Sequence, residues 1–167
     1  MRAILMAAGI GSRMKDVFVC PKCTLDVGGI PLITRTVDML LEEGIEVAIV
    51  TGYKYWEVEA CLRGKDVTIY RNPFYRVTNS MASLWFARDF IIEDDLILAN
   101  ADVYWSQDIL AGIMVDDRRA VMLGDESRKH NGDYFFQVVD GCVRKYGKDL
   151  ELRDRSTEYV GIAKLDS

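Results

Sequence analysis

The sequence predicts an α/β fold in three layers, with a mostly parallel sheet between helices on both faces. Short apolar runs of strand length alternate with amphipathic stretches of helix length over the first hundred residues. Strands that alternate with helices need right-handed crossover connections, which set the strands parallel. Beyond residue 130, two β-rich runs flank the turn dipeptide Asp140-Gly141 and predict a β-hairpin towards the C-terminus.

The first strand is the apolar run from Ala3, which ends in the small residues Ala7 and Ala8. A short extended piece is expected at 24–27, and Pro31 then occupies the favoured first position of a helix. That helix carries apolar residues at helical spacing, namely Ile33, Val37, Leu40 and Leu41. The other elements are expected as strand 47–51, helix 55–62, strand 67–70, a helix capped by Asn79 or Ser80, strand 96–99, helix 106–113, strand 120–123, hairpin strands 134–139 and 142–146, and strand 158–165.

Length and composition narrow the class of protein. The 167 residues predict one domain over residues 1–167, with 50% hydrophobic and 28% charged residues as in ordinary globular chains. The net charge of −5 argues against a nucleic-acid surface, which needs clustered Lys and Arg. No apolar run approaches the roughly 20 residues that span a bilayer. We therefore expect no nucleic-acid partner, no membrane span and a cytoplasmic location.

The loop after the first strand has features of a phosphate-binding site. Gly9 and Gly11 let backbone N–H groups approach an anion, and Arg13 and Lys22 supply positive charge nearby. A dinucleotide fingerprint does not fit, because Met14 stands where its third glycine belongs. A plain tight turn at the two glycines is the structural alternative.

Two further groups could bind metal. Asp102 leaves a buried strand at the end of the sheet where ligands bind, and its carboxylate could hold Mg²⁺ or simply cap the next helix. Cys20 and Cys23 have the CxxC spacing of a redox pair or half a zinc site. Because His130 is the sole histidine, the chain cannot supply the second pair of ligands that a zinc site needs. The alternative is that both cysteines are reduced and have no functional role.

The stretch from Ala7 to Arg13, followed by Pro21-Lys22, resembles the signature loop of nucleotidyltransferases with a Rossmann-like (GT-A-like) fold. This resemblance implies that the loop wraps a nucleoside triphosphate through Ala7, Ala8, Gly9, Gly11, Ser12, Arg13 and Lys22, with Arg13 and Lys22 in catalytic roles. Asn100-Ala101-Asp102 resembles the Asp-x-Asp-like metal motif of the family, with Asn100 in place of its first acid. Only Asp102 is therefore implied as a ligand of a Mg²⁺ cofactor.

The segment from Asn79 to Leu84 is similar to the Asn-Asn-x-x-Ser-Leu stretch of bacterial choline-phosphate and phosphonate cytidylyltransferases. This similarity implies that Asn79 and Ser83 contact cytosine and ribose, the alternative being an ordinary helix cap and a buried serine. Tyr134 falls near an aromatic residue that cages the amine in the choline enzymes. An aromatic face and a carboxylate attract an ammonium, so Tyr134 and Glu158 are expected to bind the acceptor; alternatively, Tyr134 packs on the sheet and Glu158 is solvated.

Together these resemblances imply a Mg²⁺-dependent nucleotidyltransferase, most readily a cytidylyltransferase. It would transfer CMP from CTP to a small phosphorylated or phosphonylated acceptor, such as phosphocholine or 2-aminoethylphosphonate, and release pyrophosphate. One alternative is a sugar-1-phosphate nucleotidyltransferase that uses UTP or GTP, and another is an inactive nucleotide-binding domain. Members of the family that the chain resembles continue beyond this point with further metal-binding acids. The resemblance therefore implies either that the sequence is a truncated piece or that a partner, such as a second copy in a homodimer, or a further domain completes the site.

Overall fold

The structure is a computed structural model that describes residues 1–11, 20–91, 94–130 and 132–166. Its first half forms a parallel sheet in the order β3-β2-β1-β4. These strands are β1 (Arg2–Ala7), β2 (Glu46–Thr51), β3 (Val67–Arg71) and β4 (Leu96–Asn100). The central strands β1 and β2 are almost wholly buried, as expected of parallel strands covered on both faces.

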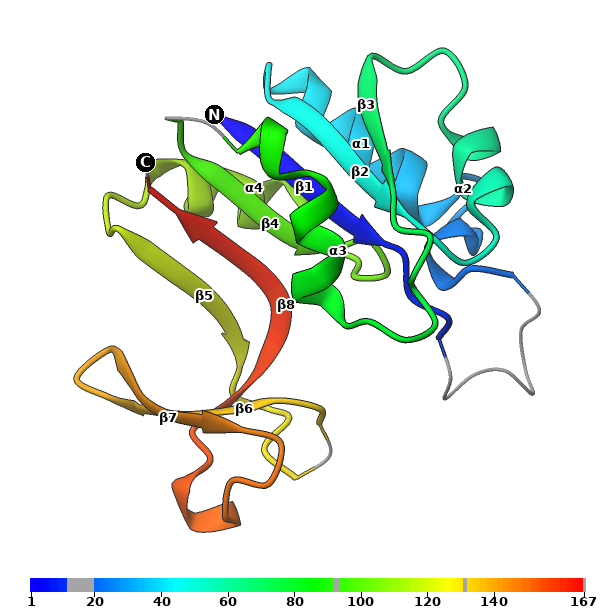
Figure 1. The fold of residues 1–167 in the computed structure, drawn as a ribbon. Helices are drawn as coiled ribbons and strands as arrows, with labels where there is room; N and C mark the ends of the chain where they lie inside the picture. Colours follow the sequence, from blue (N-terminus) through cyan, green and yellow to red (C-terminus); the bar gives the residue numbers. More distant parts are fainter. Residues whose placement is uncertain (12–19, 92–93, 131, 167) are drawn as a thin grey trace.

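Helices cover both faces of this sheet (Figure 1). The helices are α1 (Leu32–Glu42), α2 (Tyr55–Cys61), α3 (Ser80–Phe86) and α4 (Gln107–Val115). Alternate residues of β1 point to opposite sides: Leu5 joins the cluster under α1, α2 and α4, whereas Ile4 joins the cluster that includes Leu84 of α3. The predicted α/β fold in three layers is thereby confirmed.

The C-terminal part extends the sheet with antiparallel strands. β8 (Thr157–Leu165) pairs with β4 and with β5 (Ala120–Asp125), and its first residues pair with β6 (Phe135–Val139). β6 and β7 (Cys142–Gly147) form the predicted hairpin, in which Asp140 and Gly141 both have positive φ. Figure 1 shows the hairpin in a smaller lobe, joined to the main body by β5 and β8.

The predicted elements are present, with differences at their ends. The expected extended piece at 24–27 begins one residue later, because the 3-10 turn η2 (Lys22–Thr24) includes Thr24, whose hydroxyl donates to Pro21 O at 2.8 Å. Leu25 is extended, and Asp26 forms an isolated antiparallel bridge with Pro31. Pro31 is the N-cap of α1 and not its first residue. None of the helices in the described ranges is long and apolar enough to cross a membrane. The described residues also include the 3-10 turns η3 (Arg88–Phe90) and η4 (Leu152–Asp154).

Candidate active site

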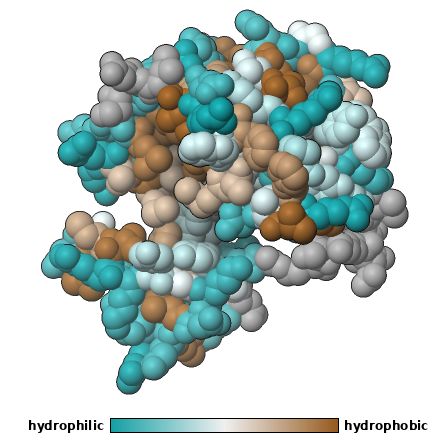
Figure 2. All heavy atoms as spheres, viewed as in Figure 1, coloured by the Kyte–Doolittle hydropathy of each residue, from teal (hydrophilic) through white to brown (hydrophobic). Residues whose placement is uncertain are grey.

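A large cavity lies at the carboxyl ends of β1 and β4, the edge at which open α/β sheets bind ligands. Its volume is about 1320 Å³. Figure 2 shows the molecule indented between the main body and the smaller lobe, and residues of both parts line the cavity. It brings together ten residues expected in the site from the sequence: Ala7, Ala8, Gly9, Gly11, Lys22, Asn79, Ser83, Asp102, Tyr134 and Glu158. The expected Ser12 and Arg13 lie outside the described residues.

The loop after β1 is shaped by close backbone contacts. Tyr53 N donates to Ala8 O at 3.1 Å, and a Cβ on Gly52 would lie 2.8 Å from that same Ala8 oxygen. Gly11 has a φ of +66°, and a Cβ there would lie 3.2 Å from Cε of Lys22. The glycines therefore make a turn, and the same turn leaves room for the Lys22 side chain to run alongside it.

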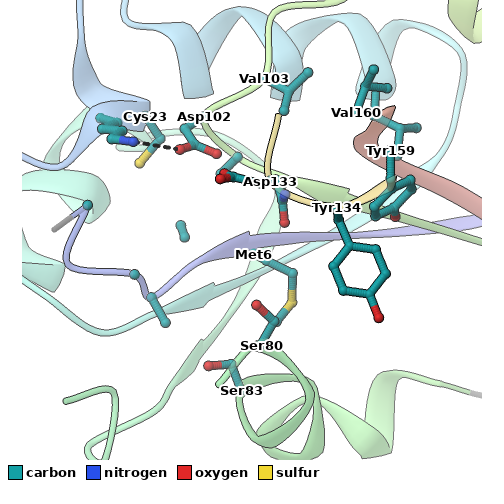
Figure 3. Close-up of a pocket in the computed structure, with 18 of the residues that line it drawn as sticks. Met6, Cys23, Ser80, Ser83, Asp102, Val103, Asp133, Tyr134, Tyr159 and Val160 are labelled. Atoms are coloured by element: carbon teal, nitrogen blue, oxygen red, sulfur yellow. Dashed lines mark ion pairs between the residues drawn. The ribbon is translucent and has the colours of Figure 1, made fainter. Parts of the chain in front are cut away.

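Lys22 and Asp102 form an ion pair, with 3.9 Å between Nζ and Oδ2 (Figure 3). Their side chains are 27% and 41% exposed. The N-cap of α4 is Ser106, so Asp102 does not cap the next helix. A partly exposed pair at this distance contributes only about 0–1 kcal/mol, which a more highly charged ligand can replace.

The residues around Asp102 suit one way of holding Mg²⁺. Within the described residues, no group of three or more His, Cys, Asp or Glu side chains could form a metal cage. Mg²⁺ is usually bound through one or two carboxylates together with substrate phosphates and water. Asp102, which is partly exposed and lines the cavity, fits that mode of binding.

All four cysteines of the chain are free thiols, so Cys20 and Cys23 are not joined by a disulfide in this structure. Cys23 is buried, and its burial, with a smaller contribution from the Asp102 carboxylate, raises the pKa of the thiol to about 12. A thiol with so high a pKa is a poor nucleophile and a poor metal ligand at neutral pH.

Ser83 of α3 lies on the opposite side of the cavity from Asp102 (Figure 3). Asn79, the N-cap of the same helix, also lines the cavity. The Asn79 side chain caps the helix by accepting a hydrogen bond from Ala82 N at 3.2 Å. Ser83 is buried, and its hydroxyl lies 2.9 Å from the side-chain nitrogen of Asn72. Both residues thus have the ordinary structural roles foreseen as the alternative, and both also line the cavity.

The smaller lobe supplies the third side of the cavity. The Tyr134 ring stacks on Tyr146, with centroids 6.2 Å apart and an interplanar angle of 23°. Glu158 is buried, so the alternative of a solvated carboxylate is wrong. Its Oε1 accepts from Asp133 N at 2.8 Å, and its Oε2 lies 3.0 Å from Nε of Arg128. Glu158 therefore orders the wall of the cavity and already shares its charge with Arg128.

The comparisons with known proteins agree with this geometry. The model of the MobA-like NTP transferase domain matches residues 3–131. The chain belongs to this family. It is 38% identical over 111 residues to the choline-phosphate cytidylyltransferase of Haemophilus influenzae, covering 65% of this chain and 47% of that protein. It is 28% identical over 159 residues to the 2-aminoethylphosphonate cytidylyltransferase of Lancefieldella rimae, covering 87% of this chain and 60% of that protein.

The chain thus spans about half to three fifths of these curated relatives. Among solved structures, the inositol-1-phosphate CTP transferase from T. maritima superposes with a TM-score of 0.80 at 18% identity, covering 99% of this chain and 70% of that one. At this level of identity the likeness shows the fold. The predicted resemblance to Rossmann-like nucleotidyltransferases, and within them to cytidylyltransferases, is confirmed.

In this MobA-like domain, sequence reasoning missed an aromatic residue and a cation of the cavity wall. Tyr159 lines the cavity beside Tyr134, and its ring centroid lies 5.4 Å from that of Phe136 (Figure 3). Burial raises the pKa of Tyr159. Arg128 also lines the cavity, and no pattern in the sequence connects it to Glu158.

Proposed function

We propose that the chain is the nucleotide-binding core of a Mg²⁺-dependent cytidylyltransferase that transfers CMP from CTP to a small phosphorylated or phosphonylated acceptor. One observation carries the proposal. Residues expected at the triphosphate, the base and the acceptor come from distant parts of the sequence and line one cavity. The names of the two relatives described above support the choice of nucleotide, since both are cytidylyltransferases.

The proposed reaction needs little covalent chemistry from the protein. An oxygen of the acceptor's phosphate or phosphonate attacks the α-phosphorus of CTP, and the bond from that phosphorus to the bridging oxygen of the β-phosphate breaks. Pyrophosphate leaves with the bond electrons. Because the attacking oxygen is already ionised at neutral pH, no side chain has to remove a proton. Positioning and charge neutralisation are what the protein must supply.

The positions of the described residues suggest which of them bind the triphosphate and which would hold the metal. Lys22 and the backbone of the loop containing Gly9 and Gly11 would bind the triphosphate, where charge-assisted hydrogen bonds are the strong ones. Asp102 would hold Mg²⁺, which neutralises charge on the phosphate oxygens when bound. Arg13 is proposed in the same role as Lys22 from the sequence alone.

The acceptor would lie between Asp102 and the wall of the smaller lobe. Tyr134 and Tyr159 there present aromatic rings, which attract an ammonium by about 0.5–2 kcal/mol. The Asp133 carboxylate belongs to the same wall. This combination favours an acceptor with an ammonium group, such as an aminoalkyl phosphate or phosphonate, over a sugar phosphate, whose sugar carries no charge. Because the Glu158 carboxylate is shared with Arg128, we assign it to the support of this wall as well as to the amine.

Pyrophosphate release tests the proposal. The chain is assayed with CTP, UTP, GTP or ATP against phosphocholine, 2-aminoethylphosphonate, glucose 1-phosphate and inositol 1-phosphate, with Mg²⁺ or with EDTA. We expect CTP and an amine acceptor to be preferred and release to need Mg²⁺. Use of UTP or GTP with a sugar phosphate would replace the proposal by the sugar-nucleotide alternative. Nucleotide binding without release in any combination would favour a nucleotide-binding domain that is inactive by itself.

A further inference from the structure

We propose that Asn72 is a positioning residue of the nucleotide site, whose amide makes the Ser83 hydroxyl a hydrogen-bond donor towards the base. This inference rests on the proposed function, since it concerns how a bound nucleotide is read. Asn72 directly follows β3, and its backbone N–H donates to Thr51 O at 2.8 Å. Its side chain is only 1% exposed, so its polar atoms must find partners within the protein.

The Asn72 amide is fully engaged, and its orientation is determined. Oδ1 accepts from Phe74 N at 2.8 Å, and Nδ2 donates to Thr78 Oγ1 and to Ser83 Oγ, each at 2.9 Å. Because the Phe74 N–H can only donate, the amide oxygen has to face it. The NH₂ group must therefore face the two hydroxyls, and both hydroxyls accept from it.

The two hydroxyls differ in the acceptor that is available for their own proton. Thr78 Oγ1 donates to Phe74 O at 2.8 Å, a good hydrogen bond. Ser83 Oγ has only a long contact of 3.4 Å to Asn79 O, and Ser83 lines the cavity. The Ser83 proton is thus the one that can turn to a better acceptor on a ligand. Cytosine and uracil both accept a hydrogen bond at O2, but at N3 cytosine accepts where uracil donates. A hydroxyl held as a donor therefore favours cytosine if it faces N3, which is the orientation of the base that this proposal requires.

The same amide anchors the cavity wall around Ser83. Its hydrogen bonds connect the end of β3 to three places: the backbone of Phe74, the side chain of Thr78 and the side chain of Ser83 in α3. The residues that lie between or beside these points and line the cavity are Tyr75, Arg76, Thr78, Asn79 and Ser80. Asn72 does not itself belong to the lining, so it would act through the residues that it holds.

The test replaces the amide by a group of the same shape. Asn72→Asp keeps an acceptor for Phe74 N but removes both donors, so the hydroxyls of Thr78 and Ser83 must turn their protons to the carboxylate. We expect the Kd for CTP to rise at least about tenfold and the preference for CTP over UTP to fall at least about fivefold. The matched control is Thr36→Ala, which removes another buried polar side chain with a single hydrogen bond to Leu32 O, away from the cavity lining. The control should lower Tm and leave the CTP to UTP ratio unchanged.

The outcomes separate this inference from the proposed function. A wild-type chain that binds neither nucleotide overturns the proposed function and this role with it. A wild-type chain that prefers CTP, together with a folded Asn72→Asp variant of unchanged preference, overturns the positioning role alone. If Asn72→Asp does not fold, Ser83→Ala and Thr78→Val are compared. Loss of the preference in Ser83→Ala alone supports the role, whereas equal effects of both substitutions, or none, overturn it.

Discussion

Removing the charge of Asp102 should change triphosphate affinity in opposite directions with and without Mg²⁺. In the structure, Asp102 lies 3.9 Å from the Lys22 ammonium, in the cavity that we assign to the triphosphate. Without metal, the carboxylate competes with the phosphates for Lys22 and repels them. With Mg²⁺, the same carboxylate is proposed to hold the ion that binds them.

The magnitudes follow from distance and exposure. Two unit charges about 4 Å apart attract by about 1 kcal/mol in water and by about 4 kcal/mol at an effective dielectric constant of about 20. Because the side chains of Lys22 and Asp102 are 27% and 41% exposed, the lower range of about 0–1 kcal/mol applies. Asp102→Asn should therefore tighten CTP binding in EDTA by at most about fivefold. In Mg²⁺ it should weaken binding by at least about tenfold, or about 1.4 kcal/mol.

Lys22→Met supplies the matched comparison, because methionine keeps an apolar chain beside Gly11 and lacks the charge. It should weaken CTP binding at least about tenfold both in EDTA and in Mg²⁺, since the cation is proposed to contact the phosphates in either case. Calorimetric titration of CTP into each variant under both conditions measures all four values. A shift of the same sign for Asp102→Asn in EDTA and in Mg²⁺ would refute the metal assignment.

Three further predictions concern the walls of the cavity. Gly52→Ala should lower the unfolding free energy by about 1–3 kcal/mol in denaturant titration, since its Cβ would lie 2.8 Å from the Ala8 carbonyl oxygen; unchanged stability would show that the loop after β1 can move aside. Tyr134→Ala should raise the KM for an amine acceptor by about twofold to thirtyfold and leave the Kd for CTP unchanged; equal effects on both constants would mean that the smaller lobe merely misfolds. Cys23, whose pKa is raised by burial to about 12, should stay protonated above the pH at which an ordinary thiol ionises. Its contribution to stability is thus complete below the ordinary thiol pKa and is lost as pH rises towards 12, and alkylation at pH 9 should label the exposed Cys142 long before Cys23.

The strands and helices could be predicted because their signals are local. The periodicity of Ile33, Val37 and Leu40 reports a buried helix face wherever that helix packs, and these three residues are fully buried. The grouping of Gly9, Lys22 and Asp102 could also be foreseen, because parallel strands bring their carboxyl ends to one edge of the sheet. Their chemical roles stay predictions until binding is measured.

The missed features depend on side-chain contacts that no local pattern records. Glu158 is buried because Arg128 and the Asp133 N–H, both from the segment between β5 and β6, satisfy its carboxylate. Asn72 stands before a proline in what reads as an ordinary loop, and its importance becomes visible only when Thr78 and Ser83 are seen around its amide. In both cases a buried polar group is kept by partners that the spacing of residue types does not reveal: distant ones for Glu158, and residues of the following loop and helix for Asn72.

Asn100 shows how the two halves of the proposed site are linked. It stands where the family resemblance implies an acid, and its place in the structure suggests a different use. A Cβ on Gly161 would lie 2.4 Å from Asn100 Nδ2, and Gly161 has a φ of +86°. The Asn100 side chain therefore occupies the space that a Cβ on Gly161 would need. Gly161 lies between two parts of β8, one of which pairs with β4 and the other with β6. Because β8 carries Tyr159 towards the acceptor wall and β4 leads to Asp102, this contact between a side chain and a glycine helps to set the distance between the proposed metal and acceptor.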